Sequence, residues 1–306
     1  MSQTAQFNSL PLLSVKPGLA DSLDQVSRDL ERYFAAPATA QDALQNAVVE
    51  LHRNYGVLRM ISLDGVAVYC AELEKLLQEF ITARLTPTPL HRELSLRALT
   101  AMMHYLDALA DGATNAALRL FPQYQELQQA RGVEMAFEVD LFFPELKVDL
   151  PSSVLSVPTA SDAPVRIKAA RAQYQQALLK WLRQDKPVAA LQGMRTAVMT
   201  VMSCLPQDQS RAFWWIAAGL MDSLVYDGLP PELNAKSMFS RLDSRMKALL
   251  EGSQVEAYAT TCEMLYLLAR SHAVSELVNG IKLTYALDDY LPENPCFAGR
   301  QRGIFR

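Results

Sequence analysis

Residues 44–80 read LQNAVVELHRNYGVLRMISLDGVAVYCAELEKLLQEF, and this stretch decides the fold. Its apolar side chains recur at steps of four and three residues, which places them on one side of a helix. The first run comprises Leu44, Val48, Leu51, Tyr55 and Leu58, and the second comprises Tyr69, Leu73, Leu76 and Phe80. Residues 62–65 (SLDG) separate the two runs and are of types that favour helix ends and turns. The stretch therefore predicts two antiparallel amphipathic helices joined by a short turn.

The same spacing continues on both sides of this pair. It predicts a helix from Leu23 to Tyr33 and another from Leu94 to Leu109, the latter after the stiff connector Thr86-Pro-Thr-Pro89. The first 112 residues should thus form about four helices, most simply arranged as an up-down bundle. Residues 1–19 contain Pro11 and Pro17 and are expected to form a loose N-terminal segment.

The chain is expected to contain two domains. Residues 133–150 change character and predict an extended segment, and residues 151–165 combine three prolines with small polar residues, which is typical of a linker. Helical spacing then returns in five or six segments up to about residue 288. We therefore divide the chain into a loose segment 1–19, a helical bundle 20–150, a linker 151–165, a second helical bundle 166–290 and a tail 291–306. The predicted fold class is all-α, with two helical-bundle domains.

Composition and motifs exclude several classes of function. Half of the 306 residues are hydrophobic, which is ample for globular cores, and the formal net charge is −4 with dispersed basic residues. The sequence therefore gives no sign of the basic patch that is typical of nucleic-acid binding. Glycine-rich phosphate loops, nucleophile elbows and clusters of metal ligands are missing from the sequence, so we expect no enzyme activity, no cofactor and no metal site. Partners should be proteins.

The cysteines and the N-terminus indicate the compartment. Cys70, Cys204, Cys262 and Cys296 are far apart in sequence and are expected to be free thiols in a reducing environment. Residues 1–17 lack the basic and apolar regions of a signal peptide, and no apolar run is long enough to span a bilayer. The expected location is the cytoplasm.

One histidine stands out. His52 precedes Gly56 by four residues, so both lie on one helix face, where a glycine leaves the imidazole accessible to a partner. The run from His52 to Leu63 resembles histidine phosphotransfer (Hpt) domains, in which the phosphorylated histidine is followed by lysine at the third position and glycine at the fourth. Gly56 fits that pattern, whereas Tyr55 stands in place of the lysine. A lysine there would stabilise a phosphoryl group by its charge, and tyrosine supplies only a hydroxyl.

The second half extends the resemblance. Residues 175–183 (QQALLKWLR), 212–220 (AFWWIAAGL), 263–269 and 281–287 are similar to the degenerate Hpt-like region near the N-terminus of the chemosensory histidine kinases of type IV pilus systems, ChpA and PilL. Phe213, Trp214 and Trp215 lie in the most specific of these pieces. These aromatic residues are typical of a helix core, and a docking anchor is the alternative interpretation.

The resemblance implies a function without catalysis. Stand-alone proteins of this type act as scaffolds in twitching motility, between a chemosensory response regulator and polar pilus-assembly proteins, and affect cyclic AMP. The implied receiver-binding surface comprises His52, Tyr55, Gly56 and Arg59. Two alternatives remain open: an active phosphotransfer protein with His52 as the phosphoacceptor, and a helical adaptor unrelated to two-component signalling.

Overall fold

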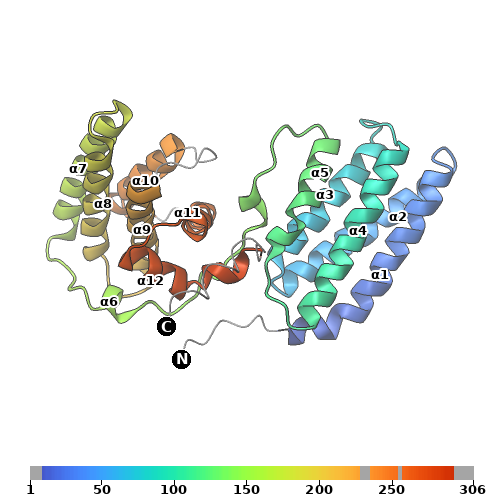
Figure 1. Ribbon diagram of the computed structural model, residues 1–306, viewed down its shortest axis with the longest axis horizontal. Helices are drawn as coiled ribbons and strands as arrows, with labels where there is room; N and C mark the ends of the chain where they lie inside the picture. The colour runs from blue at the N-terminus through green and yellow to red at the C-terminus, as the bar shows by residue number, and fades with distance from the viewer. Residues whose placement is uncertain (1–8, 228–234, 254–256, 293–306) are drawn as a thin grey trace, which may run out of the picture. The chain divides into compact units, whose positions relative to one another are not determined.

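We describe a computed structural model, and its description covers residues 9–227, 235–253 and 257–292 (Figure 1). The described residues form helices and connecting segments without a β-strand, so the predicted all-α fold class is confirmed. The chain divides into two compact units. Among the described residues, unit 1 contains 9–143 and 289–292, and unit 2 contains those between Pro144 and Asp288.

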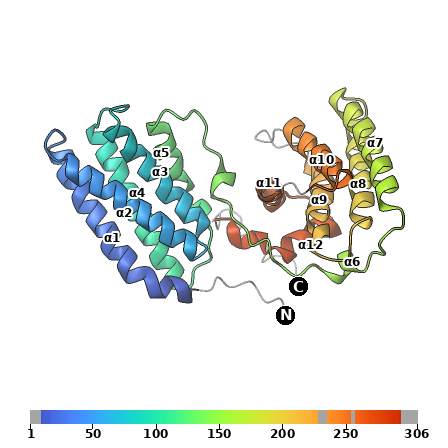
Figure 2. The ribbon, with the colours of Figure 1, turned by 180° about the vertical axis from the view of Figure 1, so that it is seen from behind.

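Unit 1 is a helical bundle. Helix α1 packs against α2 and α4, α2 packs against α3, and α5 lies against α3 and α4, as Figure 2 shows from behind. Two 3-10 turns, η1 and η2, contact α3 as well. The elements are α1 (Leu10–Ala35), α2 (Gln41–Met60), α3 (Asp64–Ile81), α4 (Pro89–Ala110), η1 (Ala117–Leu120), α5 (Phe121–Ala130) and η2 (Glu138–Leu141).

The predicted antiparallel pair is present as α2 and α3. The turn between them places Ser62 at a φ of 60°, and the N–H of Leu63 donates to the carbonyl of Leu58 at 2.9 Å. Helix α4 begins at Pro89 after the predicted stiff connector. Thr88 caps it, because its hydroxyl accepts from the N–H of His91 at 3.3 Å.

Helix α1 starts earlier than predicted. It begins at Leu10, within the segment expected to be loose up to residue 19. Pro11 lies in the first turn, where backbone N–H groups have no partner within the helix, so the missing N–H of proline costs no hydrogen bond. Pro17 lies inside the helix, but Leu12 and Leu19 on either side are buried. This burial offsets the cost of the proline, which corrects the expectation of a loose segment.

Helix α5 was not predicted. It spans only ten residues and buries only Tyr124, Leu127 and Gln128, so its apolar period is weak. The following segment, expected to be extended, contains the turn η2, and beyond it residues 142–151 form neither helix nor strand.

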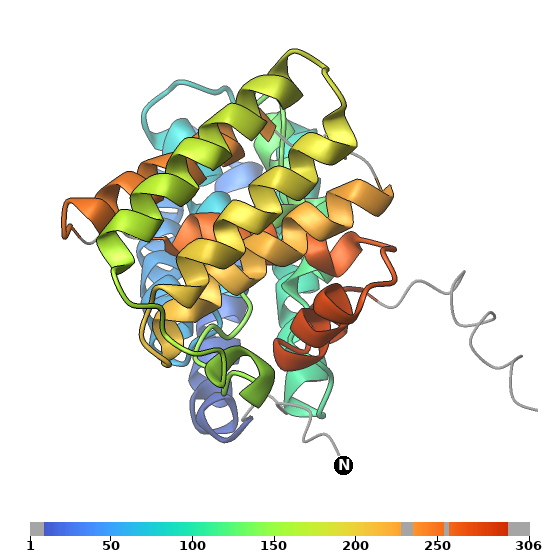
Figure 3. The same cartoon turned by 90° about the vertical axis from the view of Figure 1, so that its left-hand side faces the viewer.

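Unit 2 is also built from helices. Figure 3 shows α7, α8 and α9 side by side, and α8 packs against both of its neighbours. Helix α10 packs on α7, whereas α11 and α12 pack on α9. The elements are α6 (Ser152–Leu155), α7 (Ala163–Leu182), α8 (Pro187–Ser203), η3 (Gln209–Arg211), α9 (Ala212–Asp227), α10 (Ala235–Leu250), α11 (Tyr258–Arg270) and α12 (Glu276–Thr284). The boundary between the units falls within the 3-10 turn η4 (Leu287–Tyr290).

Helix α9 forms the centre of unit 2. Almost every residue from Phe213 to Leu224 is buried. Gly219 allows α12 to approach closely, since a Cβ atom at this position would lie 2.2 Å from Cδ1 of Ile281. A side chain at position 219 would force the Cδ1 end of Ile281 to move.

The segment expected to be a linker is attached to unit 2 by Arg211. This side chain is fully buried, and its guanidinium donates to the carbonyl oxygens of Val154 and Val157 at 2.9 and 2.7 Å and to that of Leu205 at 2.9 Å. It also donates to the hydroxyl of Thr159 at 3.2 Å. Residues 154–159 are therefore held by unit 2, whereas the sequence-based boundaries fall at residues 150 and 165.

Three of the four cysteines are described, and Cys70, Cys204 and Cys262 are buried free thiols as predicted. Cys296 lies outside the described residues, as does the predicted tail from residue 293 on. In the part of the chain that the structure covers, every helix is too short or too polar to cross a bilayer.

Candidate docking site on helix α2

Helix α2 presents one face to the core of unit 1 and the other to solvent. Its buried residues, which include Leu44, Leu51 and Leu58, pack toward α1 and α3. With roughly 3.6 residues per turn, positions 49, 52, 53, 56 and 60 fall on the opposite side. We call these five residues, Val49, His52, Arg53, Gly56 and Met60, the α2 strip.

His52 connects the strip to helix α3. Its Nδ1 atom lies 3.2 Å from Oε1 and 3.4 Å from Oε2 of Glu74 on α3. The histidine side chain is 71% exposed and that of Glu74 only 11%. Glu74 is fixed in turn by Gln78, whose Nε2 donates to Oε1 at 2.8 Å. A neutral imidazole in this contact carries its proton on Nδ1, which leaves the lone pair of Nε2 available.

Tyr55 and Arg59 lie beside the strip on the side of α3. The ring of Tyr55 stacks near that of His52, with centroids 6.2 Å apart and an interplanar angle of 27°. The Nε atom of Arg59 lies 2.9 Å from Oδ1 of Asp64. Within the strip, at its other edge, Arg53 pairs with Glu50. Both arginines next to His52 are therefore neutralised within unit 1.

Gly56 leaves an open space in the strip. A Cβ atom built on it would meet no heavy atom within 4 Å. Glycine inside a helix is about 0.5–1 kcal/mol less stable than alanine. The packing of unit 1 does not require this glycine, so its small size is available for the approach of another molecule.

Two apolar side chains flank Gly56 along the helix. Val49 is 48% exposed and Met60 is 78% exposed. Together with the bare backbone at Gly56, they form an apolar track on which charged groups stand only at the edges. Such a track suits helix-to-helix contact.

The aromatic cluster of unit 2 is not a docking anchor. Phe213, Trp214 and Trp215 are 7%, 1% and 4% exposed, respectively. The ring of Trp214 packs edge-on against that of Phe213 at 5.1 Å, and that of Trp215 lies 6.4 Å from that of Tyr285. Helix α9 is buried on most sides, which corrects the interpretation of these residues as partner-binding and supports the core interpretation.

The sequence indicated four residues of this site, and the structure brings His52, Tyr55, Gly56 and Arg59 together on α2. Glu74 was missed, because its contact with His52 depends on the register between α2 and α3. The sequence does place Glu74 on the helix that follows α2 and was predicted to run antiparallel to it, and this was the only indication of the contact. Among the described residues, no group of three or more His, Cys, Asp or Glu side chains is arranged to hold a metal ion.

Comparison with known proteins gives a consistent result. Residues 159–295 match the family described as FimL scaffold protein second domain. Over 260 residues, the chain is 26% identical to the scaffold protein FimL of Pseudomonas aeruginosa. The aligned region covers 84% of this chain and 46% of that protein. The chain thus spans about half the length of this curated relative. No solved structure matches it significantly.

Proposed function

We propose that this chain, a relative of the scaffold protein FimL, is a non-catalytic signalling scaffold that binds a protein partner through the α2 strip. The observation that carries the proposal is the glycine at position 56. This glycine lowers the stability of α2, and the packing of unit 1 does not require it. It leaves the backbone uncovered between the exposed side chains of Val49 and Met60.

The proposed partner is the receiver domain of a chemosensory response regulator. This choice rests on the resemblance of the run from His52 to Leu63 to Hpt domains, which meet receivers by helix-to-helix contact. In the proposed role, the protein acts in the cytoplasm at a cell pole. There it also binds a polar pilus-assembly protein, and it affects twitching motility and cyclic AMP. The exposure of His52 favours it over an adaptor unrelated to two-component signalling.

Binding of a purified pilus-system receiver domain to the full chain tests the proposal. Gly56→Arg should abolish the interaction, because the long side chain would occupy the open space in the strip. Thr100→Arg is the matched control, since Thr100 is exposed on α4, which packs mainly on α1 and α5. Equal binding by wild type and Gly56→Arg would refute the proposed docking surface.

The second candidate function is active phosphotransfer through His52, and one observation favours it. The contact with Glu74 holds the imidazole in the tautomer whose Nε2 is nucleophilic. In that reaction an N–P bond to Nε2 would form as the P–O bond of a receiver's phospho-aspartate breaks, and the aspartate would leave as a carboxylate.

The surroundings of His52 favour the scaffold over this alternative. A phosphoryl group on Nε2 needs positive charge nearby. Tyr55 supplies none, and Arg53 and Arg59 are already paired with Glu50 and Asp64. We therefore expect receiver binding without efficient transfer.

A further inference from the structure

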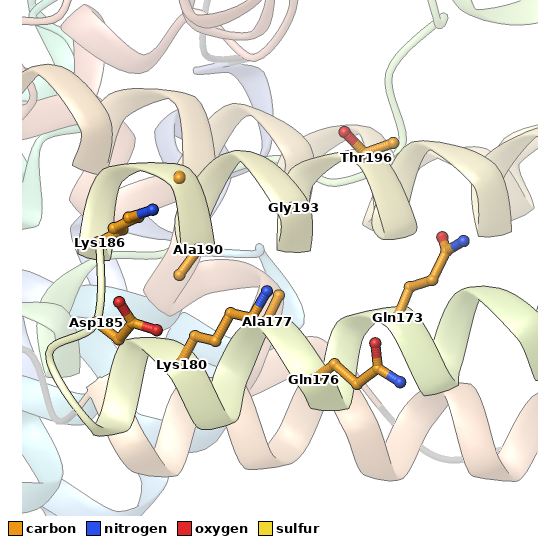
Figure 4. Close-up of a pocket in the computed structure, with 10 residues that line it drawn as sticks. Gln173, Gln176, Ala177, Lys180, Asp185, Lys186, Ala190, Gly193 and Thr196 are labelled. Carbon is orange, nitrogen blue, oxygen red and sulfur yellow. The ribbon is translucent and has the colours of Figure 1, made fainter.

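A second surface of interest is the groove between α7 and α8, with a volume of about 400 Å³ (Figure 4). The residues that line it come from both helices at helical spacing. Gln173, Gln176 and Lys180 stand along α7, and Ala190 and Gly193 stand along α8. The groove therefore follows the antiparallel helix pair for about two turns.

The floor of the groove is made of small residues. A Cβ atom on Gly193 would lie 3.2 Å from the Cβ atom of Ala177, so the two helices touch at this level. Ala190 continues the floor on α8, where it is buried. Because the side chains at this contact are a methyl group and a hydrogen atom, the backbone of another helix can come close to the floor.

The walls carry charge at one end. Lys180 reaches from the last turn of α7 toward α8, and Lys186 stands just before α8, held there by a left-handed backbone with a φ of 49° (Figure 4). Among the described residues neither lysine has an ion-pair partner, whereas Arg171, Arg195 and Arg241 of the same unit are each paired with an acid. Asp185 lines the same end, so the groove carries two positive charges and one negative charge there, and its net charge is positive.

We propose that this groove binds one amphipathic helix of a partner protein, with small apolar residues on the floor and carboxylates facing Lys180 and Lys186. A helix fits better than an extended peptide, because the backbone groups of α7 and α8 are engaged within their own helices and offer no ladder to a strand. The surface is distinct from the α2 strip, so a scaffold with both could hold two partners at once.

The test uses the full chain and a fluorescein-labelled stapled peptide of about 14 residues, in which alanine and leucine form one face and glutamate lines its edges. Its affinity for wild type is compared with that for Lys180→Glu/Lys186→Glu by fluorescence anisotropy. The control is Lys168→Glu/Arg183→Glu, which makes the same change in net charge on exposed residues of the same segment that do not line the groove. We expect a loss of at least tenfold in the first variant and less than twofold in the control.

A second pair of variants separates shape from charge. Ala189 lines the groove and is exposed, so Ala189→Trp should block the peptide, whereas Ala172→Trp on the solvent face of α7 should not. The proposal is overturned if the peptide does not bind wild type, if both charge variants lose affinity equally, or if Ala189→Trp binds as wild type does. None of these outcomes depends on a receiver domain, so this proposal and that for the α2 strip fail independently.

Discussion

The exposed imidazole of His52 is held by the largely buried carboxylate of Glu74, with 3.2 Å between Nδ1 and Oε1. This contact joins α2 to α3 and determines which ring nitrogen faces solvent. Glu74→Ala should therefore release the fixed tautomer, which nitrogen chemical shifts of the imidazole will reveal. Because the histidine is mostly exposed, the free energy of unfolding should fall by no more than about 1 kcal/mol. A wild-type imidazole with its proton on Nε2 would contradict this account.

Gly56→Ala should stabilise the chain. The added methyl group meets no atom within 4 Å, and alanine is the better helix former, so the free energy of unfolding should rise by about 0.5–1 kcal/mol. Urea denaturation measures this change. Gly219→Ala is the contrasting variant, because its Cβ would lie 2.2 Å from Cδ1 of Ile281 and displace that buried side chain, so it should stabilise the chain less than Gly56→Ala does. Destabilisation by Gly56→Ala would show that unit 1 itself needs the glycine.

Arg211→Ala should loosen the segment from residue 154 to 159. The substitution leaves the carbonyl oxygens of Val154, Val157 and Leu205 without their shared donor, which should cost about 3 kcal/mol or more. Hydrogen exchange should rise in this segment first. Arg211→Lys should restore little of the lost stability, since an ammonium group cannot replace the planar set of N–H donors of the guanidinium. Unchanged exchange in Arg211→Ala would refute this role of Arg211 in holding the segment on unit 2.

Arg131→Ala tests how α5 is attached to α3. Arg131 pairs with Glu72, whose side chain is only 2% exposed, and its Nε atom lies 2.9 Å from Oε1 of Glu79. Removal of the arginine leaves a buried carboxylate with only Lys75 at 3.2 Å, and a loss of about 3 kcal/mol is expected. In the matched control Arg97→Ala, both members of the broken Arg97–Glu126 pair are exposed, so the loss should stay below about 1 kcal/mol. Similar losses in the two variants would contradict this explanation.

The buried thiols predict a dependence on alkaline pH. Burial raises the pKa of Cys70 to about 12 and that of Cys262 to about 11, above the ordinary value of 9.0. The folded state then keeps protons that the unfolded state releases, so this contribution to stability is complete below pH 9 and is lost as pH rises through the folded pKa values. At pH 8 both thiols should resist alkylation until urea unfolds the chain. Rapid alkylation of either in the folded chain would contradict their burial.

The sequence predicts the α2–α3 pair well because its apolar period is strong and its turn residues are distinctive. It fails at α1, where buried leucines outweigh two prolines, and at α5, which is too short to show a period. The role of Arg211 is equally hidden, since its partners are backbone carbonyl groups far along the chain. Within the site, residues on a single helix could be found from their spacing, whereas Glu74 required the register between two helices.

The most direct test of the scaffold account combines binding and phosphotransfer. The purified chain and its His52→Gln variant are mixed with a phosphorylated pilus-system receiver, and bound receiver and transferred label are measured in the same samples. The account predicts that both proteins bind the receiver and that neither becomes labelled. Label on the wild type alone would make the chain a phosphotransfer protein and contradict the scaffold account, and absence of binding to either would rule out the α2 strip as the receiver site.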